Sequence, residues 1–104
     1  MRSFDEVWKF IHANLKPGDT IKNWTAYKGY LGDVMTINSI HPDHIYVDSP
    51  NAATTQKVPR DDFEAFWKVW QDYKSERVRR GDLVDVTRYS KYIISIFNWY
   101  DLKQ

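Results

Sequence analysis

Apolar residues recur at helical spacing in the first fifteen residues of the chain. The pattern begins after Ser3, which forms a capping-box sequence with Glu6, and it ends at Pro17. The spacing predicts a helix over residues 4–15. Its apolar positions are Phe4, Val7, Trp8, Ile11 and Leu15.

Between residues 20 and 58 the pattern changes to short runs of β-branched and aromatic residues, which are typical of strands. Turn-forming residues such as Pro42 and Pro50 separate the runs, and the short connections favour an antiparallel meander of three or four strands. Polar and apolar residues do not alternate cleanly, so the register stays open. The runs are TIKNWTAYKG (20–29), DVMTINSI (33–40), HIYVD (44–48) and TTQKV (54–58).

A second helical pattern starts at Asp61, where acidic residues suit the N-terminal end of a helix dipole. The spacing predicts one helix over residues 61–75. Its apolar face carries Phe63, Phe66, Trp67, Trp70 and Tyr73.

The last quarter of the chain predicts a short helical turn over residues 82–86 and then a helix over residues 90–100. The β-branched density of YIISIF (92–97) leaves a buried strand as the alternative, because periodicity alone does not separate the two. The predicted fold is therefore α+β: an N-terminal helix, an antiparallel meander, and two C-terminal helices packed on one face of the sheet.

Length and composition predict one domain over residues 1–104 with one core. The chain is 42% hydrophobic and 28% charged, and its 17 aromatic rings make up 16% of its residues. It has no cysteine and no apolar run of 18 residues, so we expect a soluble, cytoplasmic protein without a membrane anchor.

Candidate catalytic or metal-binding groups are sparse. His41 and His44, near Asp43 and Asp48, offer nitrogen and oxygen ligands, but the pattern fits a polar hairpin tip better than a metal site. Pro42-Asp43 and Asp101-Leu102-Lys103 look like two halves of a restriction-nuclease signature, although the second half follows a predicted helix rather than lying on a strand.

Other residues that suggest chemistry have simpler explanations. Asp61, Asp62 and Glu64 fit a helix N-terminus, and Ser90 has no evident histidine base. Gly29 and Gly32 flank Tyr30-Leu31 and predict a turn rather than a phosphate loop. We therefore expect a non-enzymatic protein with no cofactor and no metal.

The strongest functional signal is a local positive charge near the C-terminus, since the net charge of the whole chain is only +1. The stretch GDLVDVTRYSKYIISIF (81–97) loosely resembles a helix-turn-helix, with Leu83 and Val84 as core positions of the first helix and Ser90 opening the second. Its first helix is short for that motif. The candidate nucleic-acid-binding residues are Arg77, Arg79, Arg80, Arg88, Lys91, Tyr89 and Tyr92.

A second resemblance covers residues 20–100. The order VPRDDFEAFWKVWQDY (58–73), a basic corner and then TRYSKYIISIFNW (87–99) is similar to uncharacterised small proteins and accessory domains of bacterial mobile gene cassettes and DNA-modification loci. The resemblance implies a bacterial or mobile-element origin and brings no catalytic residues.

Three binding functions remain open. Weak nucleic-acid binding, through about five phosphate contacts, is the leading hypothesis. A protein-interaction module or homodimer is the alternative, and a ligand pocket lined by aromatic rings is the third. The candidate interface residues are Trp24, Tyr27, Tyr30, Trp99 and Tyr100.

Overall fold

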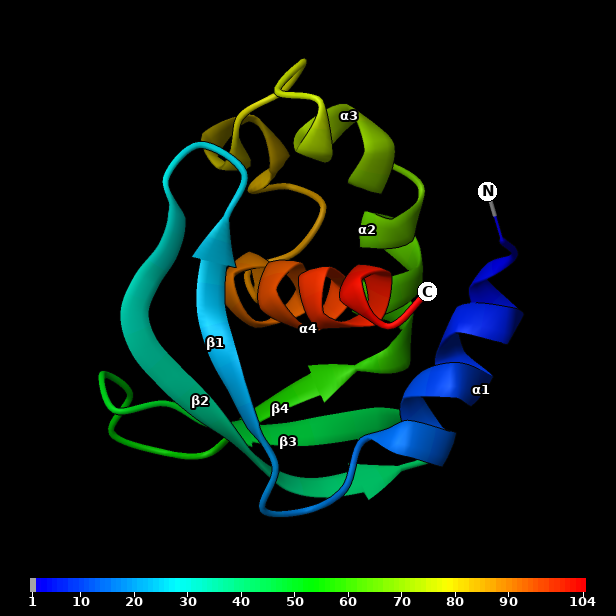
Figure 1. Cartoon of the computed structure of the whole chain (residues 1–104), viewed down its shortest axis with the longest axis vertical. Helices are drawn as coiled ribbons and strands as arrows, with labels where there is room; N and C mark the ends of the chain where they lie inside the picture. The colour runs from blue at the N-terminus through cyan, green and yellow to red at the C-terminus, as the bar shows by residue number, and fades with distance from the viewer. Residues whose placement is uncertain (1) are drawn as a thin grey trace.

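The computed structural model describes residues 2–104 and confirms the α+β fold (Figure 1). Four antiparallel strands form one sheet in the order β1-β2-β3-β4, so the chain is a meander. Helices follow and precede it. The elements are α1 (Phe4–Asn14), β1 (Thr20–Thr25), β2 (Gly29–His41), β3 (His44–Asp48), β4 (Gln56–Pro59), α2 (Arg60–Trp67), α3 (Trp70–Lys74), a 3₁₀ turn η1 (Arg80–Leu83) and α4 (Ser90–Leu102).

Helix α4 lies at the centre of the molecule, between the curved sheet and the helices α1 and α2 (Figure 1). Its middle turns are buried on nearly every side, which explains why YIISIF lacks a polar face. The helical prediction for residues 90–100 is confirmed over the strand alternative. The buried residues of α4 are Ile93, Ile94, Ser95, Ile96, Phe97 and Tyr100.

The sheet bends because β2 is much longer than its neighbours and its register shifts twice. One shift lies where β2 pairs with Lys22–Trp24 of β1. The other lies at Ile37–Ser39 of β2, where it pairs with β3. Such bulges increase local twist. The bend lets β1 and β2 pass along one side of α4 while β3 and β4 lie below it (Figure 1).

The prediction of one helix over residues 61–75 is wrong in its continuity. The helix breaks at Val69, whose backbone lies outside the helical region (φ −112°, ψ 5°) and whose N–H donates to Phe66 O at 3.0 Å. No proline or glycine marks the break. Both flanking rings, Trp67 and Trp70, pack against Phe97 of α4, with centroid distances of 5.2 and 5.5 Å.

Three local predictions also need correction. Helix α2 begins at Arg60, and its cap residue Pro59 makes no side-chain cap, so Asp61 lies in the first turn.

The turn after β1 occupies residues 26–28, and Gly29 (φ 71°) and Gly32 (φ 95°) lie within β2. The predicted helical turn over residues 82–86 is the 3₁₀ turn η1, and Val84 is 66% exposed rather than in the core.

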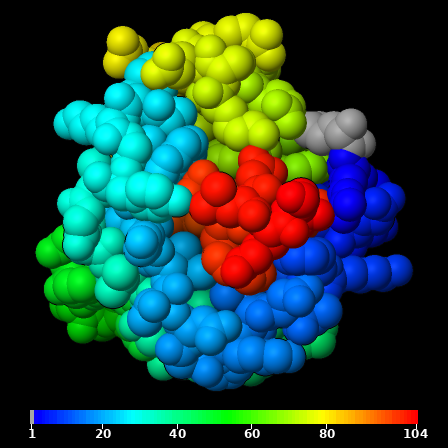
Figure 2. Space-filling view, in the orientation of Figure 1, coloured from blue at the N-terminus to red at the C-terminus, as the bar shows by residue number. Residues whose placement is uncertain are grey.

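No helix within residues 2–104 combines the length and the apolar character needed to cross a bilayer. The C-terminal residues of α4 reach the surface between the β1–β2 segment and α1, as the space-filling view shows (Figure 2, red between cyan and blue).

Candidate functional site

Three of the five basic candidates line the same hollow, which we call the basic hollow. Arg80 comes from η1, while Arg88 and Lys91 come from the residues at the start of α4. The hollow has a volume of about 450 Å³, and none of its lining residues is acidic. The other lining residues are Gly81, Val84, Thr87 and Ser90.

Local contacts hold two of these cations in place. The Arg88 guanidinium donates to Tyr89 Oη at 2.8 Å and lies 5.0 Å from the centroid of that ring. The hydrogen bond to Tyr89 raises the pKa of Arg88. Lys91 Nζ donates to Ser49 Oγ at 3.2 Å and lies 4.0 Å from Asp33 Oδ2, so its charge is partly compensated.

The hollow sits where α4 begins at Ser90. The cap residue Tyr89 makes no side-chain cap, and the first turn contains no acidic residue. A helix N-terminus carries a partial positive charge, which adds to that of the three cations. Thr87, which lines the hollow and is itself buried, donates from Oγ1 to Asp62 Oδ2 at 2.7 Å, and the negative charge of Asp62 is close enough to act on Arg88.

The structure does not bring the other two basic candidates into this hollow. Arg77 forms an exposed ion pair with Asp72, whose Oδ1 lies 2.9 Å from the guanidinium. Arg79 stacks over Tyr27 at 4.8 Å from the ring centroid, at the turn between β1 and β2. The basic residues therefore divide into one group of three and two separately engaged arginines.

The aromatic candidates are less exposed than expected. Tyr89 and Tyr92 are half-buried and pack on the core. Among the interface candidates, Tyr100 is buried at 2% exposure, which corrects its assignment to an exposed patch. Trp24 and Tyr27 are half-buried against Trp70 and Tyr73.

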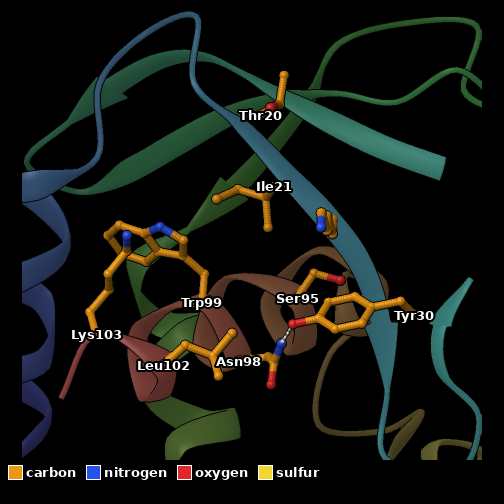
Figure 3. Close-up of a pocket in the computed structure, with 9 residues that line it drawn as sticks. Thr20, Ile21, Tyr30, Ser95, Asn98, Trp99, Leu102 and Lys103 are labelled. Carbon is orange, nitrogen blue, oxygen red and sulfur yellow. Dashed lines mark hydrogen bonds between the residues drawn. The ribbon is translucent and has the colours of Figure 1, made fainter. Parts of the chain in front are cut away.

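A second hollow lies between β1 and α4, and we call it the β1–α4 groove (Figure 3). Its volume is about 360 Å³. Two of the interface candidates, Tyr30 and Trp99, line it. Sequence patterns missed its remaining lining because Ile21, Lys22 and Lys103 have no shared spacing, and only the packing of α4 on β1 brings them together.

The histidines and the nuclease-like residues make structural contacts. His41 and His44 stack with centroids 4.4 Å apart, and a hydrogen bond to His44 lowers the pKa of Asp43. Within residues 2–104, no group of three His, Asp or Glu side chains is placed to hold a metal ion. Asp101 lies in α4 and accepts from Trp70 Nε1 at 3.0 Å and from Lys74 Nζ at 2.8 Å.

The number of aromatic rings was the reason to expect a homodimer, and the structure gives this reason less weight. Tyr30 is 52% exposed, whereas the other 16 rings are buried or half-buried, so one small core covers them at least in part. The homodimer therefore stays a prediction. Comparison of the chain with models of protein families, with curated proteins and with solved structures finds no match.

Proposed function

We propose that this chain is a nucleic-acid-binding module that contacts phosphates through the basic hollow. The observation that supports the proposal most strongly is the grouping of Arg80, Arg88 and Lys91 around one hollow without an acidic lining residue. A net charge of +1 gives little attraction over the whole surface, so a phosphate group has to be bound by a local arrangement of this kind.

The contacts that the basic hollow offers are to the backbone of a nucleic acid rather than to its base edges. A recognition helix needs an exposed face, whereas the middle turns of α4 are buried between the sheet and the helices. Arginine and lysine bind phosphate oxygens without reading sequence. We therefore propose weak binding that depends little on sequence, with Tyr89 beside Arg88 as a ring for stacking at the margin.

Salt dependence tests the number of phosphate contacts. Three contacts predict that the logarithm of affinity for duplex DNA falls with the logarithm of salt concentration at a slope of about −2.7. This slope is shallower than the roughly −4 to −5 expected if all five basic residues contacted phosphates. Fluorescence anisotropy with mixed-sequence duplexes and single strands, starting at low ionic strength, measures it.

A pair of charge-matched variants tests the location. Arg80→Gln/Arg88→Gln removes two charges from the hollow, and Arg77→Gln/Arg79→Gln removes two charges outside it. We expect the first variant to lose most of the binding and the second to keep it. Equal loss in both variants, or no binding of the native chain to either nucleic acid at tens of micromolar, would refute the proposal.

A further inference from the structure

The β1–α4 groove combines an apolar wall with two ammonium groups. The indole of Trp99 and the ring of Tyr30 stand at its two ends, and Ile21 forms the wall between them (Figure 3). The volume of about 360 Å³ lies within the range of pockets that hold small organic molecules. These surfaces suit a planar, apolar group placed between two aromatic rings.

The polar groups of the groove favour a negatively charged ligand. Lys22 and Lys103 both line it, and no lining residue is acidic. Among residues 2–104, neither ammonium group forms an ion pair with a carboxylate, although Lys22 lies 5.5 Å from the Tyr30 ring centroid. Asp19 lies in an adjoining hollow and accepts from the backbone N–H of Lys16 at 2.9 Å.

An unused donor adds to this preference. The indole N–H groups of Trp8, Trp67 and Trp70 each donate to an oxygen within the protein, at 3.0 to 3.1 Å. Within residues 2–104, those of Trp24 and Trp99 have no such acceptor, and of these two residues only Trp99 lines the groove. A carboxylate oxygen is a strong acceptor for an indole N–H and for an ammonium group.

The packing of α4 on β1 favours a small molecule over an added peptide strand. Although β1 is an edge strand, the Trp24 N–H donates to Ser95 Oγ of α4 at 3.1 Å, and the Ala26 N–H donates to Tyr73 Oη at 3.1 Å. Neighbouring strands need about 4.8 Å between their backbones, and α4 already occupies this position. The edge of β1 is therefore closed to strand addition at Trp24 and at the turn that follows, which leaves the residues that line the groove, Thr20–Lys22, as a stretch shorter than most strands.

We propose that the β1–α4 groove binds a small organic carboxylate with a planar, apolar body. The body lies between Trp99 and Tyr30, and the carboxylate accepts from Lys22 or Lys103. The groove and the basic hollow have no lining residue in common, so this site is independent of the proposed nucleic-acid contacts.

Three probes separate the two requirements of the site. 2-Naphthoate has both the apolar body and the charge, 2-naphthamide keeps the body without the charge, and acetate keeps the charge without the body. In a ¹H–¹⁵N NMR titration, 2-naphthoate should shift the indole signal of Trp99 with a Kd of ~1 mM or tighter. The amide should bind at least severalfold more weakly, and acetate should give no saturable shift.

Variants locate the binding. Lys22→Gln and Lys103→Gln should each weaken 2-naphthoate about two- to fivefold, as expected for partly exposed charge pairs. Trp99→Ala, followed through the side-chain amide of Asn98, should abolish the saturable shift. Arg80→Gln/Arg88→Gln has the same charge change as Lys22→Gln/Lys103→Gln but should leave this affinity unchanged.

Four results would overturn the assignment. They are equal affinity for 2-naphthoate and its amide, saturable binding of acetate at the same signals, an equal loss in the Arg80→Gln/Arg88→Gln control, and no shift at 10 mM 2-naphthoate, about ten times the expected Kd. Because these variants and probes are read independently of nucleic acid, failure here leaves the proposed function standing.

Discussion

At the scale of single residues, the buried aromatic side chains differ in the hydrogen bonds that their polar atoms form. Trp8 Nε1 donates to Pro42 O, and Trp67 Nε1 donates to Arg2 O, so each indole binds a backbone carbonyl far away in sequence. Large rings with a polar atom usually find a partner when buried. These bonds fix where α1 and α2 lie relative to the chain around them.

For two buried tyrosines, we expect removal of the hydroxyl to have different effects on the free energy of unfolding. Tyr73 Oη accepts from the Ala26 N–H at 3.1 Å, whereas Tyr100 Oη has no hydrogen-bond partner within residues 2–104. Tyr73→Phe should therefore lower the free energy of unfolding by about 1 to 2 kcal/mol, since it leaves a backbone N–H without an acceptor. Tyr100→Phe should change it by less than about 0.5 kcal/mol or raise it. Urea unfolding measures both.

Tyr73 also gives a test that depends on pH. Burial raises the pKa of the Tyr73 hydroxyl above its ordinary value of 10.0, because the charged form is poorly solvated there. The unfolded chain loses this proton at a lower pH than the folded chain does. The contribution of protonated Tyr73 to the free energy of unfolding is therefore fully present below pH 10 and is lost as pH rises through the folded pKa. Tyr73→Phe should lose stability less steeply than the native chain above pH 10. Identical alkaline profiles would contradict the assignment.

At the scale of elements, the end of α3 has a hydrogen-bond pattern that the sequence hides. The N–H of Arg77 donates to Asp72 O at 3.0 Å and the N–H of Glu76 donates to Tyr73 O at 3.1 Å, which together form a Schellman motif. Glu76 has a positive φ of 62°, where glycine is usual. Because the position holds glutamate, no glycine signalled the end of the helix.

Glu76→Gly should therefore stabilise the protein. A non-glycine residue in the left-handed region costs about 1 to 2 kcal/mol, and glycine has an entropic cost of its own, so we expect a gain of about 0.5 to 1 kcal/mol. Glu76→Ala is the matched control: it removes the same side chain but keeps the backbone cost. Thermal unfolding of both variants decides the matter, and an equal gain in the alanine variant would assign the effect to the side chain.

At the scale of the whole molecule, Trp70 connects layers that are distant in sequence. Its ring contacts Trp24 of β1 at a centroid distance of 6.3 Å and Phe97 of α4 at 5.5 Å, and it is fully buried. One core thus joins the sheet, the α2–α3 segment and α4. Removal of this ring affects every layer at once.

Trp70→Ala should cost about 3 to 5 kcal/mol, the range for large aromatic residues at buried sites. Val84→Ala is the control, since Val84 is 66% exposed and its loss should change stability by no more than about 0.5 kcal/mol. Thermal and urea unfolding measure both variants. A midpoint that is unchanged in Trp70→Ala would show that the ring does not lie in a single cooperative core.

The sequence by itself determined the elements whose signals are local. Ser3 Oγ accepts from the Glu6 N–H at 3.3 Å, which is one of the two hydrogen bonds of the predicted capping box, and the apolar spacing of residues 4–15 places one face of α1 in the core. The meander followed from short connections, which let consecutive strands pair. Periodicity and capping depend only on neighbours along the chain, so both could be read without the fold.

Tertiary structure decided what depends on residues far apart. The break at Val69 has no proline or glycine to mark it, and the rings on both sides of it pack on Phe97, which is distant in sequence; the 66% exposure of Val84 likewise depends on how η1 lies on the rest of the chain. The sequence indicated Arg80, Arg88 and Lys91 but also Arg77 and Arg79, because a count of charged residues does not tell where each side chain points. Only the turn between η1 and α4 groups the first three around one hollow, and only the contact of α4 with β1 brings Trp99 and Lys22 into the lining of one groove.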